Sequence, residues 1–151
     1  MTKIVDFPIY PHLKKFILKF YDLREGEVVQ VGMNNSIGIA MKHVIREKKP
    51  LQRDIEKMTD RIQFELCTDI AHCEIRYSYI IAFNKSYNKV FKDHLILWIK
   101  AQAKAGINAR QSVINFLKEY ELDENEYSYD SAYRHWTRFK SPKKRREKLT
   151  V

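Results

Sequence analysis

The sequence predicts a mainly helical fold with a small antiparallel β element, which belongs to the α+β class. Most of the chain carries apolar residues at spacings of about three or four positions, as on one face of a helix. Shorter stretches in the first half are β-branched or alternate apolar with polar residues, as strands do. We therefore expect a single domain over residues 1–140, with a mixed α/β part at 1–83 and a helical part at 84–140. Residues 141–151 are expected to form a flexible basic tail.

The first fifty residues predict a helix, a strand and a second helix. Residues 10–22 place apolar side chains at helical spacing opposite three lysines, and Pro11 suits the first helical turn. Residues 26–35 hold a short β-branched run bounded by glycine and asparagine, which is typical of a strand between turns. Residues 36–50 carry a second helical stripe, which must end by Pro50.

Residues 51–83 admit two interpretations. The alternation of Ile62, Phe64 and Leu66 predicts a strand, and a second β-rich run follows at 75–83. With the preceding strand, these two would make a small antiparallel sheet. The second run could equally begin the next helix.

Two further helices are predicted next. Residues 85–106 carry a broad apolar face and close with Gly106, a common residue after a helix end. Asn108 can cap a helix that runs to Tyr120. Its spacing predicts that five residues face inward: Ala109, Val113, Phe116, Leu117 and Tyr120. Four are predicted to face outward: Gln111, Ser112, Asn115 and Lys118.

A last helix can start at a cap formed by Ser128 or Asp130 and run to about Lys140. Its predicted packed face holds Ala132, Trp136 and Phe139. The opposite face is polar and carries residue types that reach base edges and phosphates in a major groove. These are Ser131, Arg134, His135 and Arg138. Tyr133 and Thr137 flank this row, where their hydroxyls could bond phosphate oxygens.

The charge distribution indicates a polyanionic partner. The 28 lysines and arginines against 19 acids give a formal charge of +9, which is typical of proteins that bind nucleic acid or anionic surfaces. A basic surface that only aids solubility is the alternative. Five acids and no base occupy residues 119–127, whereas eight bases and two acids occupy 128–151. The acids precede the last helix, where they complement its dipole.

Residues 107–140, INARQSVINFLKEYELDENEYSYDSAYRHWTRFK, resemble a helix-turn-helix unit of the kind found in small phage and mobile-element proteins. The resemblance implies DNA binding by the second helix. It assigns base contacts to Ser131, Arg134, His135 and Arg138. It assigns phosphate contacts to Lys140, Lys143, Lys144, Arg145 and Arg146. One departure is the acidic segment LDENEYS, which is longer than the about three or four residues that usually join such helices.

Other kinds of site find little support in the sequence. Cys67, His72 and Cys73 lie close together, but their spacing is not that of a zinc site. The common phosphate-loop, nucleophile-elbow and paired-histidine motifs do not occur, so we expect no enzyme activity, cofactor or small-molecule substrate. No apolar run approaches the about 20 residues of a membrane span, and the N-terminus lacks a secretory pattern. The expected location is therefore cytoplasmic, without a membrane partner.

The sequence thus predicts a nucleic-acid-binding protein, foremost a reader of double-stranded DNA that acts in transcription, replication or packaging in a bacterium or phage. One short helix reads few base pairs, so a homodimer would suit this role. The alternative is a protein-interaction or assembly module, such as a virion or adaptor component, with a basic arm that contacts nucleic acid without sequence choice. RNA binding is a third alternative, although no sheet motif with stacking aromatics occurs. The face with Arg134, His135 and Arg138 discriminates between the first two functions, because a DNA reader leaves it exposed and an assembly module buries it.

Overall fold

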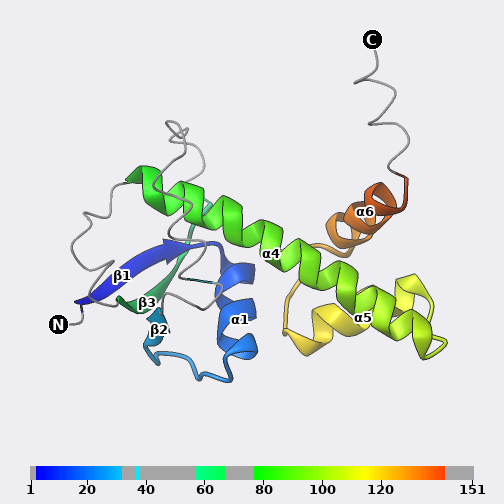
Figure 1. Cartoon of the computed structure of the whole chain (residues 1–151), viewed down its shortest axis with the longest axis horizontal. Helices are drawn as coiled ribbons and strands as arrows, with labels where there is room; N and C mark the ends of the chain where they lie inside the picture. The colour runs from blue at the N-terminus through cyan, green and yellow to red at the C-terminus, as the bar shows by residue number, and fades with distance from the viewer. Residues whose placement is uncertain (1–2, 32–36, 38–56, 67–76, 142–151) are drawn as a thin grey trace, which may run out of the picture. The chain divides into compact units, whose positions relative to one another are not determined.

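The computed structural model describes residues 3–31, 37, 57–66 and 77–141 (Figure 1). This part of the chain forms four helices and three strands, and the chain divides into two compact units, Met1–Phe91 and Lys92–Val151. In chain order the elements are β1 (Lys3–Ile9), α1 (Pro11–Phe20), β2 (Val29–Val31), β3 (Asp60–Leu66), α4 (Tyr77–Lys104), α5 (Ala109–Glu119) and α6 (Tyr129–Lys140). The mainly helical α+β class is confirmed.

The sheet has the order β1-β3-β2 and is mixed rather than antiparallel. β3 pairs antiparallel with β1, where Phe7 lies opposite Ile62, and parallel with β2, where Val29 lies opposite Phe64. The predicted antiparallel sheet is therefore wrong for the β2 pair. A parallel pair needs a connection of a dozen or more residues, and the long segment 32–59 between β2 and β3 satisfies this requirement.

The sequence interpretation missed β1 entirely. Its inner face is formed by alternate residues, and Phe7 and Ile9 are fully buried while Ile4 is exposed. Pro8 interrupts this pattern in the sequence, because proline is disfavoured inside central strands. β1 lies at an edge of the sheet, where a proline is tolerated.

Aromatic side chains fill the core of the first unit. The Phe7 ring lies 5.4 Å from the Phe64 ring and 5.1 Å from the Phe83 ring, between centroids. Phe16 of α1 meets Phe91 of α4 edge-on at 5.3 Å. Rings in such tilted arrangements add to the about 2 to 3 kcal/mol that burial of each side chain contributes. These contacts join β1, β3, α1 and the first half of α4.

The helix predicted from Pro11 and the strand that contains Ile62 and Phe64 are confirmed as α1 and β3. The strand predicted at 75–83 is wrong, because α4 already begins at Tyr77. Five consecutive residues of this segment, from Ile80 to Asn84, are buried. A helix buried on most sides loses its amphipathic period, so the run resembles a strand in sequence. Of the helix predicted at 36–50, only Ile37 lies within the described residues.

The second unit holds the end of α4, then α5 and α6. Gly106 ends α4 with a φ of +82°, a conformation that glycine adopts without strain. Asn108 caps α5, as predicted, and its side chain accepts a hydrogen bond of 2.8 Å from the Gln111 amide. Ser112 is buried rather than exposed, and its hydroxyl is satisfied by donation to the Asn108 carbonyl. The indole of Trp98 on α4 donates to the Ser112 carbonyl at 3.0 Å.

Candidate nucleic-acid interface

Ser128 fixes the start of α6. Its hydroxyl oxygen accepts a hydrogen bond of 3.1 Å from the Ser131 amide, so Ser128 rather than Asp130 is the cap. Ahead of it, the Asp123 carboxylate accepts from the amides of Asn125 and Glu126 and folds the acidic connector into a turn. The Glu126 amide also donates to the Asp123 carbonyl at 3.1 Å, which reinforces this turn ahead of α6. The connector therefore has a defined backbone.

The inner face of α6 differs from the prediction at one position. Ala132 and Trp136 are buried, as expected, whereas Phe139 is 46% exposed. Phe139 lies in the last turn of the helix and stacks on Trp136 with 5.9 Å between ring centroids. Phe139 thus extends the packed face outward instead of belonging to the core.

The outer face of α6 presents most of the predicted contact residues. Ser131, Arg134, Arg138 and Lys140 are exposed, and His135 is half-buried. Arg134 and Arg138 lie one helical turn apart on the side opposite Ala132. The structure therefore brings the two guanidinium groups to one solvent-facing surface. Lys143, Lys144, Arg145 and Arg146 lie outside the described residues.

Two hydroxyls on α6 are committed to local hydrogen bonds. The Thr137 hydroxyl donates to the Arg134 carbonyl at 2.9 Å, so its proton is not directed at a ligand. The Ser131 hydroxyl oxygen accepts from the Ser128 hydroxyl at 2.8 Å, which leaves the Ser131 proton for donation. Of the two, Ser131 is therefore the one suited to contact a phosphate or a base acceptor.

His135 lies in a positively charged environment that α4 and α6 build together. Burial lowers the pKa of His135, the nearby charge of Lys92 on α4 lowers it further, the carboxylate of Asp93 opposes this, and Arg138 again lowers it. The imidazole is thus mainly neutral at pH 7. A neutral imidazole can both donate and accept a hydrogen bond.

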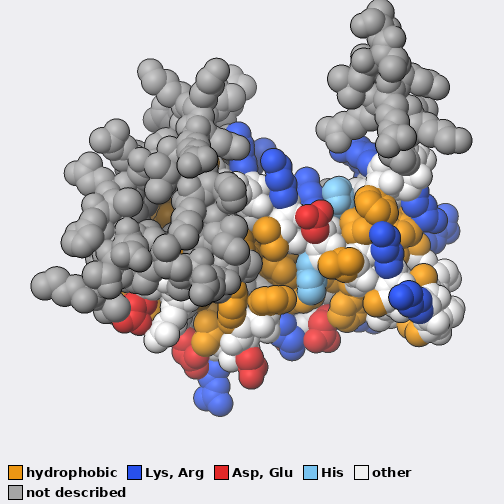
Figure 2. All heavy atoms as spheres, viewed as in Figure 1, with side chains coloured by type: hydrophobic (Ala, Val, Ile, Leu, Met, Phe, Trp, Pro, Cys, Tyr) orange, Lys and Arg blue, Asp and Glu red, His pale blue; other side chains and the backbone are white. Residues whose placement is uncertain are grey.

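Two lysines lie over the stacked rings of Trp136 and Phe139. The Lys140 ammonium lies 5.0 Å from the centroid of Trp136, and the Lys100 ammonium of α4 lies 4.7 Å from the centroid of Phe139. Figure 2 shows Lys and Arg side chains around α6, with hydrophobic side chains between them. The sequence interpretation missed Lys92 and Lys100, since nothing in a single sequence shows which face of α4 lies beside α6. Within the described residues, Lys92 and Lys100 of α4 together with Arg134, Arg138 and Lys140 of α6 form this surface, which we call the basic strip.

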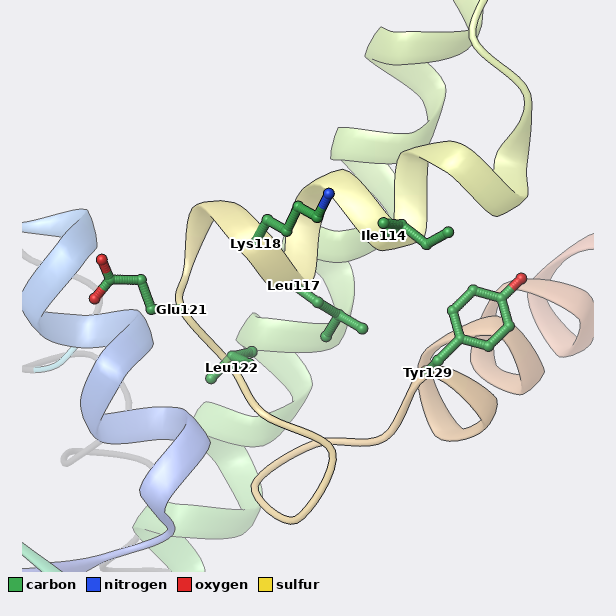
Figure 3. Close-up of a pocket in the computed structure, with 6 residues that line it drawn as sticks. All are labelled: Ile114, Leu117, Lys118, Glu121, Leu122 and Tyr129. Carbon is green, nitrogen blue, oxygen red and sulfur yellow. The ribbon is translucent and has the colours of Figure 1, made fainter.

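A shallow apolar groove of about 430 Å³ lies between α5, the connector and the first residue of α6 (Figure 3). Ile114 and Leu117 of α5, Leu122 of the connector and Tyr129 of α6 supply its apolar walls. Lys118 and Glu121 are its charged residues. The groove is separate in chemistry from the basic strip, because apolar atoms line most of it.

The helix-turn-helix geometry itself stays a prediction. α5 and α6 contact each other, but residues 120–128 join them, which is longer than the about three or four residues of that motif. No family model, curated protein or solved structure matches this chain.

The remaining sequence predictions about sites concern metals and membranes. Cys67, His72 and Cys73 lie outside the described residues, and no group of three or more potential metal ligands occurs within them. None of the described helices is both long enough and apolar enough to cross a bilayer.

Proposed function

We propose that this chain binds double-stranded DNA through the outer face of α6, in the manner of a helix-turn-helix reader. The observation that carries this proposal is the exposure of Arg134 and Arg138 on one face, while Ala132 and Trp136 anchor the opposite face. An α-helix fits the major groove, and guanidinium groups make paired hydrogen bonds to guanine edges there. The role would be that of a transcription, replication or packaging factor of a bacterium or phage.

In this proposal the helix and the tail have different tasks. Arg134, Arg138 and Ser131 supply base contacts and thus sequence preference. Lys140 and the basic residues after Pro142 neutralise phosphates and release counterions, which adds affinity without sequence choice. A second copy of the chain would double the number of base pairs read.

One observation favours a second candidate function, a protein-interaction or assembly module. The groove beside Tyr129 is apolar, and Ile114 at its wall is 37% exposed. Apolar surface of this kind is found in protein interfaces. In that case the basic tail would contact nucleic acid without choosing a sequence.

Fluorescence anisotropy with labelled duplexes tests the proposal. The intact chain, a chain cut after Lys140, and a double variant Arg134→Ala with Arg138→Ala are titrated with random duplex and with a genomic-fragment pool at two salt concentrations. The cut should weaken the salt dependence of binding. The double variant should lose about tenfold or more in affinity for preferred fragments, since a paired arginine contact is worth roughly 1 to 3 kcal/mol.

A matched control removes the same charge elsewhere. Arg24 and Lys57 are exposed residues of the first unit, so Arg24→Ala with Lys57→Ala should lower affinity slightly and leave the preference intact. Absence of duplex binding by the intact chain at low salt would contradict the proposal. Equal losses for both double variants would mean that only net charge matters, which favours the assembly module.

A further inference from the structure

Lys92 and Lys100 are two lysines of α4 that lie beside α6 but do not belong to the proposed reading face. Lys92 is close enough to act on the charge state of His135. Lys100 reaches Phe139 in the next turn of α6. Both lysines belong to the second unit. They lie beside successive turns of α6, Lys92 at His135 and Lys100 at Phe139.

We propose that Lys92 and Lys100 of α4 form a phosphate-binding row beside α6. The ligand is the sugar-phosphate backbone of one DNA strand, at the edge of the groove that α6 enters. This inference rests on the proposed function and adds contacts from a second helix. It makes α4 a part of the interface rather than a scaffold alone.

The half-exposed Phe139 supports this assignment. A phenylalanine ring that is 46% exposed contributes less by burial than a core ring does. Its ring instead holds the Lys100 ammonium at 4.7 Å, an attraction of roughly 0.5 to 1 kcal/mol at an exposed site. Phe139 in turn stacks on Trp136, and the Lys140 ammonium lies over the Trp136 ring. Two ammonium groups are thus held near their places before a ligand arrives.

Such preorganisation matters for a flexible side chain. A lysine loses rotamer freedom when it binds, at a cost of roughly 0.5 to 1.5 kcal/mol. An aromatic ring that restricts Lys100 beforehand reduces this cost. The position of Lys140 near the end of α6 has an alternative explanation, because cations stabilise a helix C-terminus. That explanation does not apply to Lys100, because Lys104 is the basic residue in the last turn of α4.

The charge balance around His135 also favours an anionic ligand. The charged groups that act on His135 are Lys92, Asp93 and Arg138, two cations and one carboxylate. Asp93 is exposed, so solvent screens the attraction between its carboxylate and the two cations. A phosphate at this point would relieve the repulsion between the two cations.

Salt-dependent DNA binding tests the row. In a double variant, Lys92→Gln with Lys100→Gln, the slope of log affinity against log salt should fall by about one to two units. Preference among sequences should stay unchanged, since phosphate contacts carry no sequence information. Phe139→Leu keeps an apolar side chain but removes the ring, and it should weaken binding about twofold to threefold.

The control is Lys57→Gln with Lys118→Gln, which removes two charges from residues that do not belong to the row. Circular dichroism melts establish that all variants fold. If the Lys92 and Lys100 variant behaves like the control while the Arg134 and Arg138 variant loses binding, the row is overturned and the proposed function stands. If the intact chain binds no duplex, both fall. If the row variant loses affinity only for anionic lipid vesicles and not for duplex, the DNA assignment of the row is overturned.

Discussion

Asn84 joins β1, α1 and α4 through one buried amide. Its side-chain oxygen accepts from the Tyr10 amide at 3.0 Å, and its nitrogen donates to the carbonyls of Pro8 at 3.1 Å and Ile80 at 2.8 Å. The residue is fully buried, so the backbone groups it satisfies depend on it. Asn84 thus fixes the backbone where β1 ends and α1 begins.

Replacement of this amide should therefore be costly. Asn84→Ala removes the hydrogen bonds of this side chain to the Tyr10 amide and the Pro8 carbonyl, and should lower the free energy of unfolding by about 2 kcal/mol or more. Urea denaturation measures this. Asn115→Ala is the control, because the bonds of the Asn115 side chain within the described residues are to the side chains of Gln111 and Gln102 near the surface. A loss at Asn84 no greater than at Asn115 would show that this part of the backbone relaxes.

The stability of helix α6 depends on its N-terminal cap, Ser128. The Ser128 hydroxyl satisfies the Ser131 amide, and replacement of such a cap by alanine costs about 1 kcal/mol. Ser128→Ala should accordingly lower the melting temperature, whereas Ser128→Asp keeps an acceptor and should restore it. If Ser128→Ala melts like the wild type, the Glu124 carboxylate, which accepts from the Tyr129 amide at 3.3 Å, sustains the helix start alone.

Elements with a clear local signal were predictable, whereas elements set by tertiary packing were not. Asn108 and Ser128 mark their helices through cap chemistry that acts within a few residues. The early part of α4 contains five consecutive buried residues, Ile80 to Asn84, and this burial erases the helical period that a sequence shows. Likewise Arg134 and Arg138 were found from spacing along one helix, but Lys92 required knowledge of which helix lies beside α6.

The stability of the whole molecule should depend on pH through two histidines. Burial lowers the pKa of His94, and burial with neighbouring cations lowers that of His135. A histidine whose pKa is lower in the folded state binds a proton more readily when unfolded. Stability should therefore fall as the pH drops from about 7.5 to about 5.5, through the ordinary histidine pKa near 6.5.

Urea midpoints across this pH range test the prediction. His94 Nε2 lies 2.8 Å from the Tyr120 hydroxyl, and glutamine can replace it as a hydrogen-bond partner. The double variant His94→Gln with His135→Gln should show a flatter pH dependence than the wild type. An unchanged dependence would place the titrating groups elsewhere in the molecule.

The end of β1 has a consequence for self-association. Exposed sheet edges can recruit strands from other molecules, which starts aggregation. At Pro8 this edge has no backbone donor, and its carbonyl is already bonded to Asn84. An incoming strand would find no donor there, and the acceptor already has one partner. The residue that obscured the strand in the sequence thus also protects it from pairing with a neighbouring molecule at high concentration.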